Sequence, residues 1–98
     1  MPALHVRIEG RVQGVGFRWF TRVAARKLQL SGWVANLRDG SVEVAASGPA
    51  DKLEQFKREL LRGPDGANVT QIHDLDPVEG ELQFPFVIDK RGANAALR

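Results

Sequence analysis

The stretch Gly10–Phe20 most restricts what this chain can fold into, because it joins two different hydrophobic periodicities. In residues 4–9 apolar and polar side chains alternate, which predicts a strand with one buried face. From residue 17 to about residue 30, apolar side chains recur at steps of three and four, which predicts an amphipathic helix. Glycines at positions 10, 14 and 16 lie between the two patterns. The chain is therefore predicted to pass from a strand into a helix through a glycine-rich turn.

A turn of this kind favours anion binding, because the first N–H groups of a helix have no partner within the helix. The helix dipole adds partial positive charge at the same end. Together these features form a site for an anion, above all for phosphate. Arg18 lies at the start of the predicted helix and adds a planar set of donors that matches two phosphate oxygens. The sequence thus predicts binding of a phosphoryl group; the alternative is a tight turn that merely starts a helix.

A hairpin is predicted after the first helix. Residues 39–40, Asp-Gly, separate the strand-like runs 33–37 and 42–46, which is typical of a two-residue hairpin loop. In this register Asn36 lies across from Glu43, on the face opposite to the apolar one. The apolar face then consists of the pairs Leu37–Val42, Ala35–Val44 and Trp33–Ala46. A four-residue loop would keep these pairs and loosen the end of the ladder.

The second half of the chain repeats the pattern of helix and strand. A second helix is predicted after Pro49, with the apolar stripe Leu53, Phe56 and Leu60. Residues 69–74 predict a weaker strand with a bulge or a late start, because their apolar side chains do not alternate cleanly. A last strand is predicted over residues 84–90, and Pro85 indicates that it lies at a sheet edge or starts after the proline. Residues 91–98 are expected to form a mobile tail.

The order strand, helix, strand, strand, helix, strand, with room for a short extra strand at the end, predicts one α+β domain over residues 1–90. Right-handed strand–helix–strand units place both helices on one face of an antiparallel sheet. This βαββαβ sandwich is the ferredoxin-like arrangement. Because that arrangement hosts many functions, the fold alone does not identify an activity.

The composition of the chain excludes several classes of function. The chain has no cysteine, which excludes disulfides, thiolate nucleophiles and cysteine-based zinc sites. No apolar run approaches the roughly 20 residues of a membrane span, and the first residues do not resemble a signal peptide, so we expect a cytoplasmic protein. Residues 1–40 carry seven Lys or Arg and two acidic residues, a net charge of +5, whereas residues 41–98 carry seven and ten, a net charge of −3. The positive half would attract small anions to the glycine-rich turn.

Three sequence blocks stand out together: Gly10-Arg11-Val12-Gln13-Gly14-Val15-Gly16-Phe17-Arg18, Gly32-Trp33-Val34-Ala35-Asn36 and Asp39-Gly40-Ser41-Val42-Glu43. These blocks closely resemble the acylphosphatase family, and the resemblance covers nearly the whole chain in element order and length. It implies a ferredoxin-like fold and hydrolysis of the carboxyl–phosphate bond of acyl phosphates. It also implies a small-molecule acyl phosphate as the binding partner. We expect a monomer that binds neither nucleic acid nor a membrane.

The resemblance assigns roles to particular positions. Arg18 matches the family's catalytic arginine, which grips phosphate oxygens, and Asn36 matches the asparagine that positions the attacking water. The phosphate would be cradled by the backbone amides of Arg11, Val12, Gln13, Gly14, Val15 and Gly16.

Acyl phosphate chemistry needs few further groups. The leaving group is a carboxylate whose conjugate acid has a pKa of about 4, so it can depart without a general acid. The substrate's own phosphate, with a second pKa of about 6, can accept the proton of the attacking water. We therefore expect no metal, no cofactor and no histidine base.

Two other functions are open at this point. An RNA-binding module shares the fold class, but it needs exposed aromatic residues on the central strands and a matching RNA signature. A phosphate-loop domain can also act as a carrier or regulatory unit in carbamoyl-phosphate chemistry. A nucleoside triphosphatase is disfavoured because the motif GxxxxGK[ST] is absent. His5 and His73 have no partner motif, and we interpret them as surface or satisfied side chains.

Overall fold

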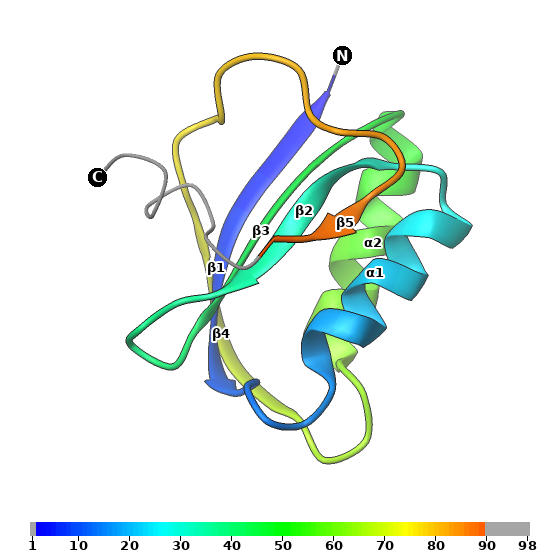
Figure 1. The fold of residues 1–98 in the computed structure, drawn as a ribbon. Coiled ribbons are helices and arrows are strands. Elements are labelled where there is room, and N and C mark those ends of the chain that lie inside the picture. The colour runs from blue at the N-terminus through cyan, green and yellow to red at the C-terminus, as the bar shows by residue number, and fades with distance from the viewer. Residues whose placement is uncertain (1, 90–98) are drawn as a thin grey trace.

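The structure is a computed structural model that describes residues 2–89, and it confirms the predicted ferredoxin-like α+β fold. Figure 1 shows the two helices side by side on one face of the sheet. The tail predicted for residues 91–98 lies outside the described residues. Within residues 2–89, neither helix is long and apolar enough to cross a membrane. The elements follow in the order β1 (Ala3–Arg11), α1 (Phe17–Lys27), β2 (Ser31–Asn36), β3 (Val42–Ser47), α2 (Ala50–Arg62), β4 (Asn68–Asp74) and β5 (Val87–Ile88).

The sheet has five strands in the order β4-β1-β3-β2-β5. The pairs β1–β3, β1–β4 and β2–β3 are antiparallel, as predicted. The pair β2–β5 is parallel, so the expectation of a wholly antiparallel sheet is wrong at this edge. The reason is the path of the chain in Figure 1, which leaves β4 at one edge, crosses to the other edge and there runs in the same direction as β2.

The hydrophobic core lies between the sheet and the helices. The strands contribute alternate residues, among them Val6, Ile8 and Val44, all of which are fully buried. The predicted apolar stripe of α2 is also buried. Phe17, the first residue of α1, is only 1% exposed. Core packing of Phe17 therefore fixes where the helix begins and where the glycine-rich loop must end.

The β2–β3 hairpin lies where it was predicted, but its register differs from the prediction by one residue. Asn36, not Leu37, lies opposite Val42. The turn explains the difference, because Gly40 has a positive φ of 92° whereas Asp39 does not have a positive φ. A two-residue type I′ loop requires a positive φ at both central positions. The predicted two-residue loop is therefore wrong.

The loop of this hairpin comprises three residues, 38–40. It is closed by a hydrogen bond of 2.9 Å that Leu37 N donates to Ser41 O. A shift of one residue moves every side chain of a strand to the other face of the sheet. As a result Asn36 shares a face with the core residue Val34, on the side that the helices cover, and not the opposite face that we predicted.

β4 contains the irregularity predicted from its apolar pattern. Its register with β1 shifts between the pairs Glu9–Gln71 and Gly10–Val69, so Thr70 is the extra residue of a β-bulge. Gly10 has a φ of 127°, and a Cβ at this position would lie 2.0 Å from a backbone oxygen of β4. Glycine is therefore required at this position, one residue before the end of β1.

Two element boundaries fall short of the predicted ones. α1 ends at Lys27 rather than near Leu30, because Gln29 has a φ of 57°, in the left-handed region that does not continue a helix. The last strand covers only Val87–Ile88 rather than residues 84–90. It starts after Pro85 and lies at the sheet edge, as the proline predicted.

Candidate active site

A pocket of about 360 Å³ lies where the glycine-rich loop, the start of α1, the end of β2 and β5 meet. We call it the loop pocket. It brings together Arg18 and Asn36, which are 18 positions apart in the sequence, together with much of the glycine-rich loop. Of the other predicted loop residues, Arg11 and Val15 do not line it: Arg11 pairs with β4, and Val15 packs against the core. The lining residues are Val12, Gln13, Gly14, Gly16, Phe17, Arg18, Trp19, Asn36 and Ile88.

The backbone of the loop presents unpaired N–H groups at this pocket. Gly14 and Gly16 have φ values of 75° and 77°, and a Cβ at either position would meet nothing within 4 Å. Glycine is therefore favoured there by backbone conformation and not by lack of space. Gly16 is the N-cap of α1 and provides no side-chain acceptor, and the first turn carries no acidic residue. Within residues 2–89, the N–H groups of residues 12–19 have no hydrogen-bond acceptor, so they are available to an anion.

The two predicted side chains also have free hydrogen-bonding capacity. Arg18 is partly buried and forms no ion pair with any other residue in the range 2–89. Asn36 Oδ1 is buried, and no described residue donates a hydrogen bond to it. A buried polar atom without a partner is costly, and such atoms often mark a ligand or water site. The pocket thus combines a guanidinium, a free amide oxygen and a row of N–H donors.

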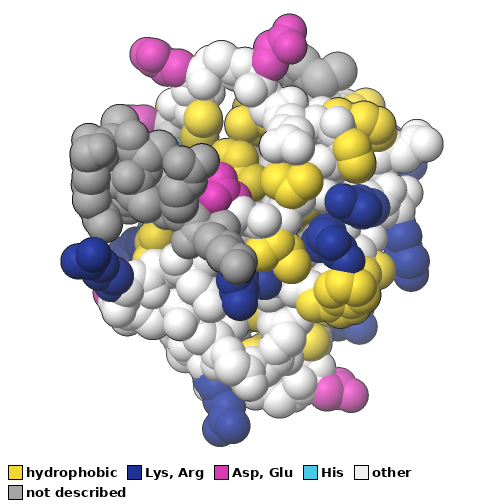
Figure 2. Space-filling model, in the orientation of Figure 1, with side chains coloured by type: hydrophobic (Ala, Val, Ile, Leu, Met, Phe, Trp, Pro, Cys, Tyr) yellow, Lys and Arg dark blue, Asp and Glu magenta, His cyan; other side chains and the backbone are white. Residues whose placement is uncertain are grey.

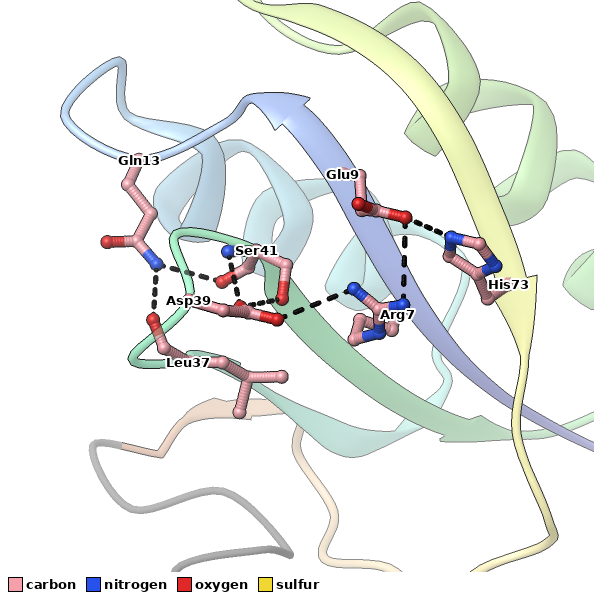
Figure 3. A network of polar contacts seen from close by, with 7 residues as sticks. All are labelled: Arg7, Glu9, Gln13, Leu37, Asp39, Ser41 and His73. Carbon is pink, nitrogen blue, oxygen red and sulfur yellow. Dashed lines mark hydrogen bonds and ion pairs between the residues drawn. The ribbon is translucent and has the colours of Figure 1, made fainter.

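Gln13 connects the loop to the hairpin that carries Asn36 (Figure 3). Its Nε2 donates to Leu37 O and to Ser41 O, in both cases over 2.8 Å. The sequence suggested only a backbone role for Gln13, so the side-chain contact is a further finding. No local sequence signal predicts it, because the two acceptors are backbone carbonyls 24 and 28 positions further along the chain.

The hairpin tip to which Gln13 binds is itself held by Asp39. Asp39 Oδ1 accepts a hydrogen bond of 2.9 Å from Ser41 N and another from the Ser41 hydroxyl, and Arg7 lies 3.5 Å from Oδ2 (Figure 3). The Ser41 hydrogen bonds, chiefly that of its hydroxyl, lower the pKa of Asp39 below its ordinary value of 3.8, and the Arg7 charge adds to the effect. A lowered pKa means that this carboxylate stabilises the fold above pH 3.8, and that the stabilisation is lost as the pH falls through the folded-state pKa.

Both histidines lie outside the loop pocket. His5 Nε2 is 2.6 Å from Glu43 Oε2, and His73 contacts the carboxylate of Glu9. The interpretation of His5 and His73 as satisfied side chains is therefore confirmed. Among the described residues, the pocket is lined by no carboxylate and no imidazole, so its polar chemistry rests on Arg18, Asn36, Gln13 and the loop amides.

The fold and the pocket define a class of protein: a ferredoxin-like α+β fold in which a glycine-rich loop precedes the first helix and an arginine lies in the first turn of that helix. Residues 4–84 match the model of the acylphosphatase family. An acylphosphatase of Thermotoga petrophila is 49% identical over 72 residues, which are 74% of this chain and 80% of that protein. An acylphosphatase of Pseudomonas aeruginosa is 47% identical over 82 residues, covering 83% and 90% of the two chains.

A solved structure agrees with these sequence matches. The crystal structure of acylphosphatase from Bacillus subtilis superposes with a TM-score of 0.80 at 38% identity, over 91% of this chain and 99% of that one. The chain belongs to the acylphosphatase family, and it is an enzyme of the acylphosphatase class, a hydrolase. The predictions of family, fold and enzyme class are thereby confirmed.

Proposed function

We propose that the acylphosphatase activity of this chain takes place in the loop pocket, without a metal ion. In this proposal the loop amides between Arg11 and Gly16 cradle the phosphate, Arg18 grips its oxygens and Asn36 positions the attacking water. The observation that carries the proposal is that Arg18 and Asn36, from separate elements, line one pocket together with N–H groups that have no other acceptor in the described chain.

The phosphate end of the site rests on fixed donors. Phosphoryl transfer depends mainly on positioning and on stabilising the charge of the equatorial oxygens. N–H groups held by the backbone need no reorganisation when that charge develops, so they stabilise a transition state efficiently. The Arg18 guanidinium offers two parallel N–H groups to two phosphate oxygens. Arg11 and Val15 do not line the pocket, so in this proposal the amides of Val12, Gln13, Gly14 and Gly16 lie nearest to the phosphate.

The water end of the site rests on Asn36. Its buried Oδ1 has no partner among residues 2–89 and can accept a hydrogen bond from a water molecule. The water attacks phosphorus and transfers its proton to a phosphate oxygen, and the P–O bond to the acyl group breaks. The electron pair leaves with the carboxylate, which needs no protonation because its conjugate acid has a pKa of about 4. No step requires a group that the pocket lacks.

The direct test is hydrolysis of benzoyl phosphate by the purified protein with and without EDTA. We expect saturable turnover that EDTA does not change and that inorganic phosphate inhibits competitively. Turnover lost on chelation and restored by a divalent cation would contradict the metal-free mechanism. Titration with short RNA in the same buffer tests the RNA-binding alternative, and we expect no saturable binding.

The Gln13 contact leads to a second prediction. Gln13→Glu keeps the side-chain length but replaces the two N–H donors by a carboxylate facing the Leu37 and Ser41 carbonyls. We expect kcat/KM for benzoyl phosphate to fall by roughly 10- to 100-fold, because a displacement of about 1 Å in a catalytic group costs on that order. The measurement is steady-state kinetics, with urea unfolding to show that the variant is folded.

The matched control for Gln13→Glu is Gln55→Glu, which makes the same change on an exposed position of α2. We expect the control to retain the kcat/KM of the unmodified enzyme. If the two variants behaved alike, the contact between the loop and the hairpin would have no part in catalysis.

A further inference from the structure

The loop pocket has a polar part and an apolar margin. Trp19 lines the pocket, although its side chain is not part of the hydrophobic core and the residue is 59% exposed. Ile88, from β5, lines the same pocket and is partly buried. Figure 2 shows exposed hydrophobic side chains next to Lys and Arg side chains over the surface that α1 forms. An exposed tryptophan in the lining of a pocket offers apolar surface that a bound ligand can cover.

The Trp19 ring is held in place from one side. The Arg22 guanidinium lies over the ring, 4.2 Å from the ring centroid, in a cation–π contact. Arg22 does not line the loop pocket, whereas Trp19 does. The contact with Arg22 therefore involves a residue outside the pocket lining. A ring restrained in this way loses little further freedom when a ligand packs against it.

An acyl phosphate consists of a charged phosphate and an acyl group, which correspond to the polar part and the apolar margin of the loop pocket. If the phosphate lies on the loop amides and Arg18, the acyl carbon is two bonds away from phosphorus and the acyl group must lie against the remaining wall. Among the lining residues, Phe17 and Val12 are each 1% exposed and belong to the core. The apolar surface left to contact an acyl group is therefore supplied by Trp19 and Ile88.

We propose that Trp19 is the specificity-determining residue for the acyl group, and that the enzyme prefers acyl phosphates with an aromatic or bulky apolar acyl group over acetyl phosphate. This inference rests on the proposed function of the loop pocket. A flat acyl group stacks on the free surface of the indole and displaces water from both. The phosphate contacts are the same for all acyl phosphates, so the discrimination arises at Trp19.

The test compares kcat/KM for benzoyl phosphate and acetyl phosphate in the unmodified enzyme and in Trp19→Ala. We expect the unmodified enzyme to prefer benzoyl phosphate by on the order of tenfold, which is the scale of an aromatic contact together with its buried area. In Trp19→Ala most of this preference should disappear, with a larger loss for benzoyl phosphate than for acetyl phosphate. Trp19→Phe should retain much of it, and inhibition by inorganic phosphate should change little in either variant.

Val23→Ala is the matched control, because Val23 is also an exposed apolar residue of α1 but does not line the pocket. We expect this variant to keep the benzoyl-to-acetyl ratio. An unmodified enzyme without preference, or a ratio that Trp19→Ala leaves unchanged, would overturn the inference. Loss of activity toward both substrates by the same factor would assign Trp19 a purely structural role and would also overturn it.

A binding measurement separates this inference from the proposed function. The chain has two tryptophans, so Trp33→Phe leaves Trp19 as the single fluorophore. We expect benzoylphosphonate, which lacks the scissile oxygen bridge, to change the Trp19 fluorescence saturably and to be displaced by inorganic phosphate. If this binding is seen but no acyl phosphate is hydrolysed, the catalytic proposal fails while the contact stands. If hydrolysis proceeds but the fluorescence does not respond, the Trp19 inference alone fails.

Discussion

Arg18→Lys is expected to lower kcat/KM for benzoyl phosphate nearly as much as Arg18→Ala, in both cases by roughly 10²- to 10³-fold. A lysine ammonium is a point charge and does not reproduce the two parallel N–H groups of a guanidinium. Because Arg18 forms no ion pair within residues 2–89, neither replacement leaves a described carboxylate unpaired. The loss should therefore reflect the missing contacts to phosphate. Steady-state kinetics and thermal unfolding of both variants provide the measurement.

The control for Arg18 is Arg58→Lys, on the exposed surface of α2 and outside the loop pocket. It makes the same chemical change without touching the site, and its kcat/KM should equal that of the unmodified enzyme. Near-normal turnover by Arg18→Lys would show that positive charge alone is sufficient at this position, contrary to the bidentate contact that we propose.

Asn36→Ala is expected to lower kcat by a factor similar to that for Arg18, roughly 10²- to 10³-fold, with inhibition by inorganic phosphate nearly unchanged. In the proposed mechanism Asn36 contacts the water and not the phosphate, so its removal affects the transition state much more than phosphate binding. The two quantities to measure are kcat and the inhibition constant of phosphate.

A comparison with Asn68→Ala, at the exposed start of β4, corrects the Asn36 result for effects of removing an asparagine in general. If Asn36→Ala instead weakens phosphate binding in proportion to its loss of turnover, Asn36 holds the phosphate and the assignment of the water to this residue is wrong.

The sequence was sufficient to predict the fold because each element has a clear local cause. Alternation in β1 and the three-to-four spacing in α1 and α2 distinguish strands from helices, and all three elements are present in the structure. The bulge in β4 was also visible, since Val69 and Ile72 do not share a simple period of two. Arg18 and Asn36 were predicted as partners from the resemblance, and the structure brings them to one pocket.

The sequence-based predictions are wrong or incomplete where the structure depends on the φ of one residue or on contacts between residues far apart in the sequence. The Asp39-Gly40 pair fits a two-residue turn, yet the φ of Asp39 is not positive and the loop has three residues. Because of this difference of one residue, Asn36 lies on the face of the sheet that the helices cover and not on the opposite face, where the predicted register placed it. The Gln13 side-chain contact could not be predicted, because its acceptors are carbonyls that only the folded hairpin brings near.

The short strand β5 has a consequence for association between molecules. A free sheet edge offers a row of N–H and C=O groups to which a strand from another chain can add. On the outer side of β2 these groups are engaged: Gly32 N donates to Gln83 O over 2.8 Å, and Asp89 N donates to Val34 O over 2.9 Å. Residues 83–89 thus shield the strand that ends at Asn36. The covering segment forms a strand of only two residues, and Pro85 before it has no N–H to donate. It therefore offers fewer backbone groups to a strand of another molecule than β2 would.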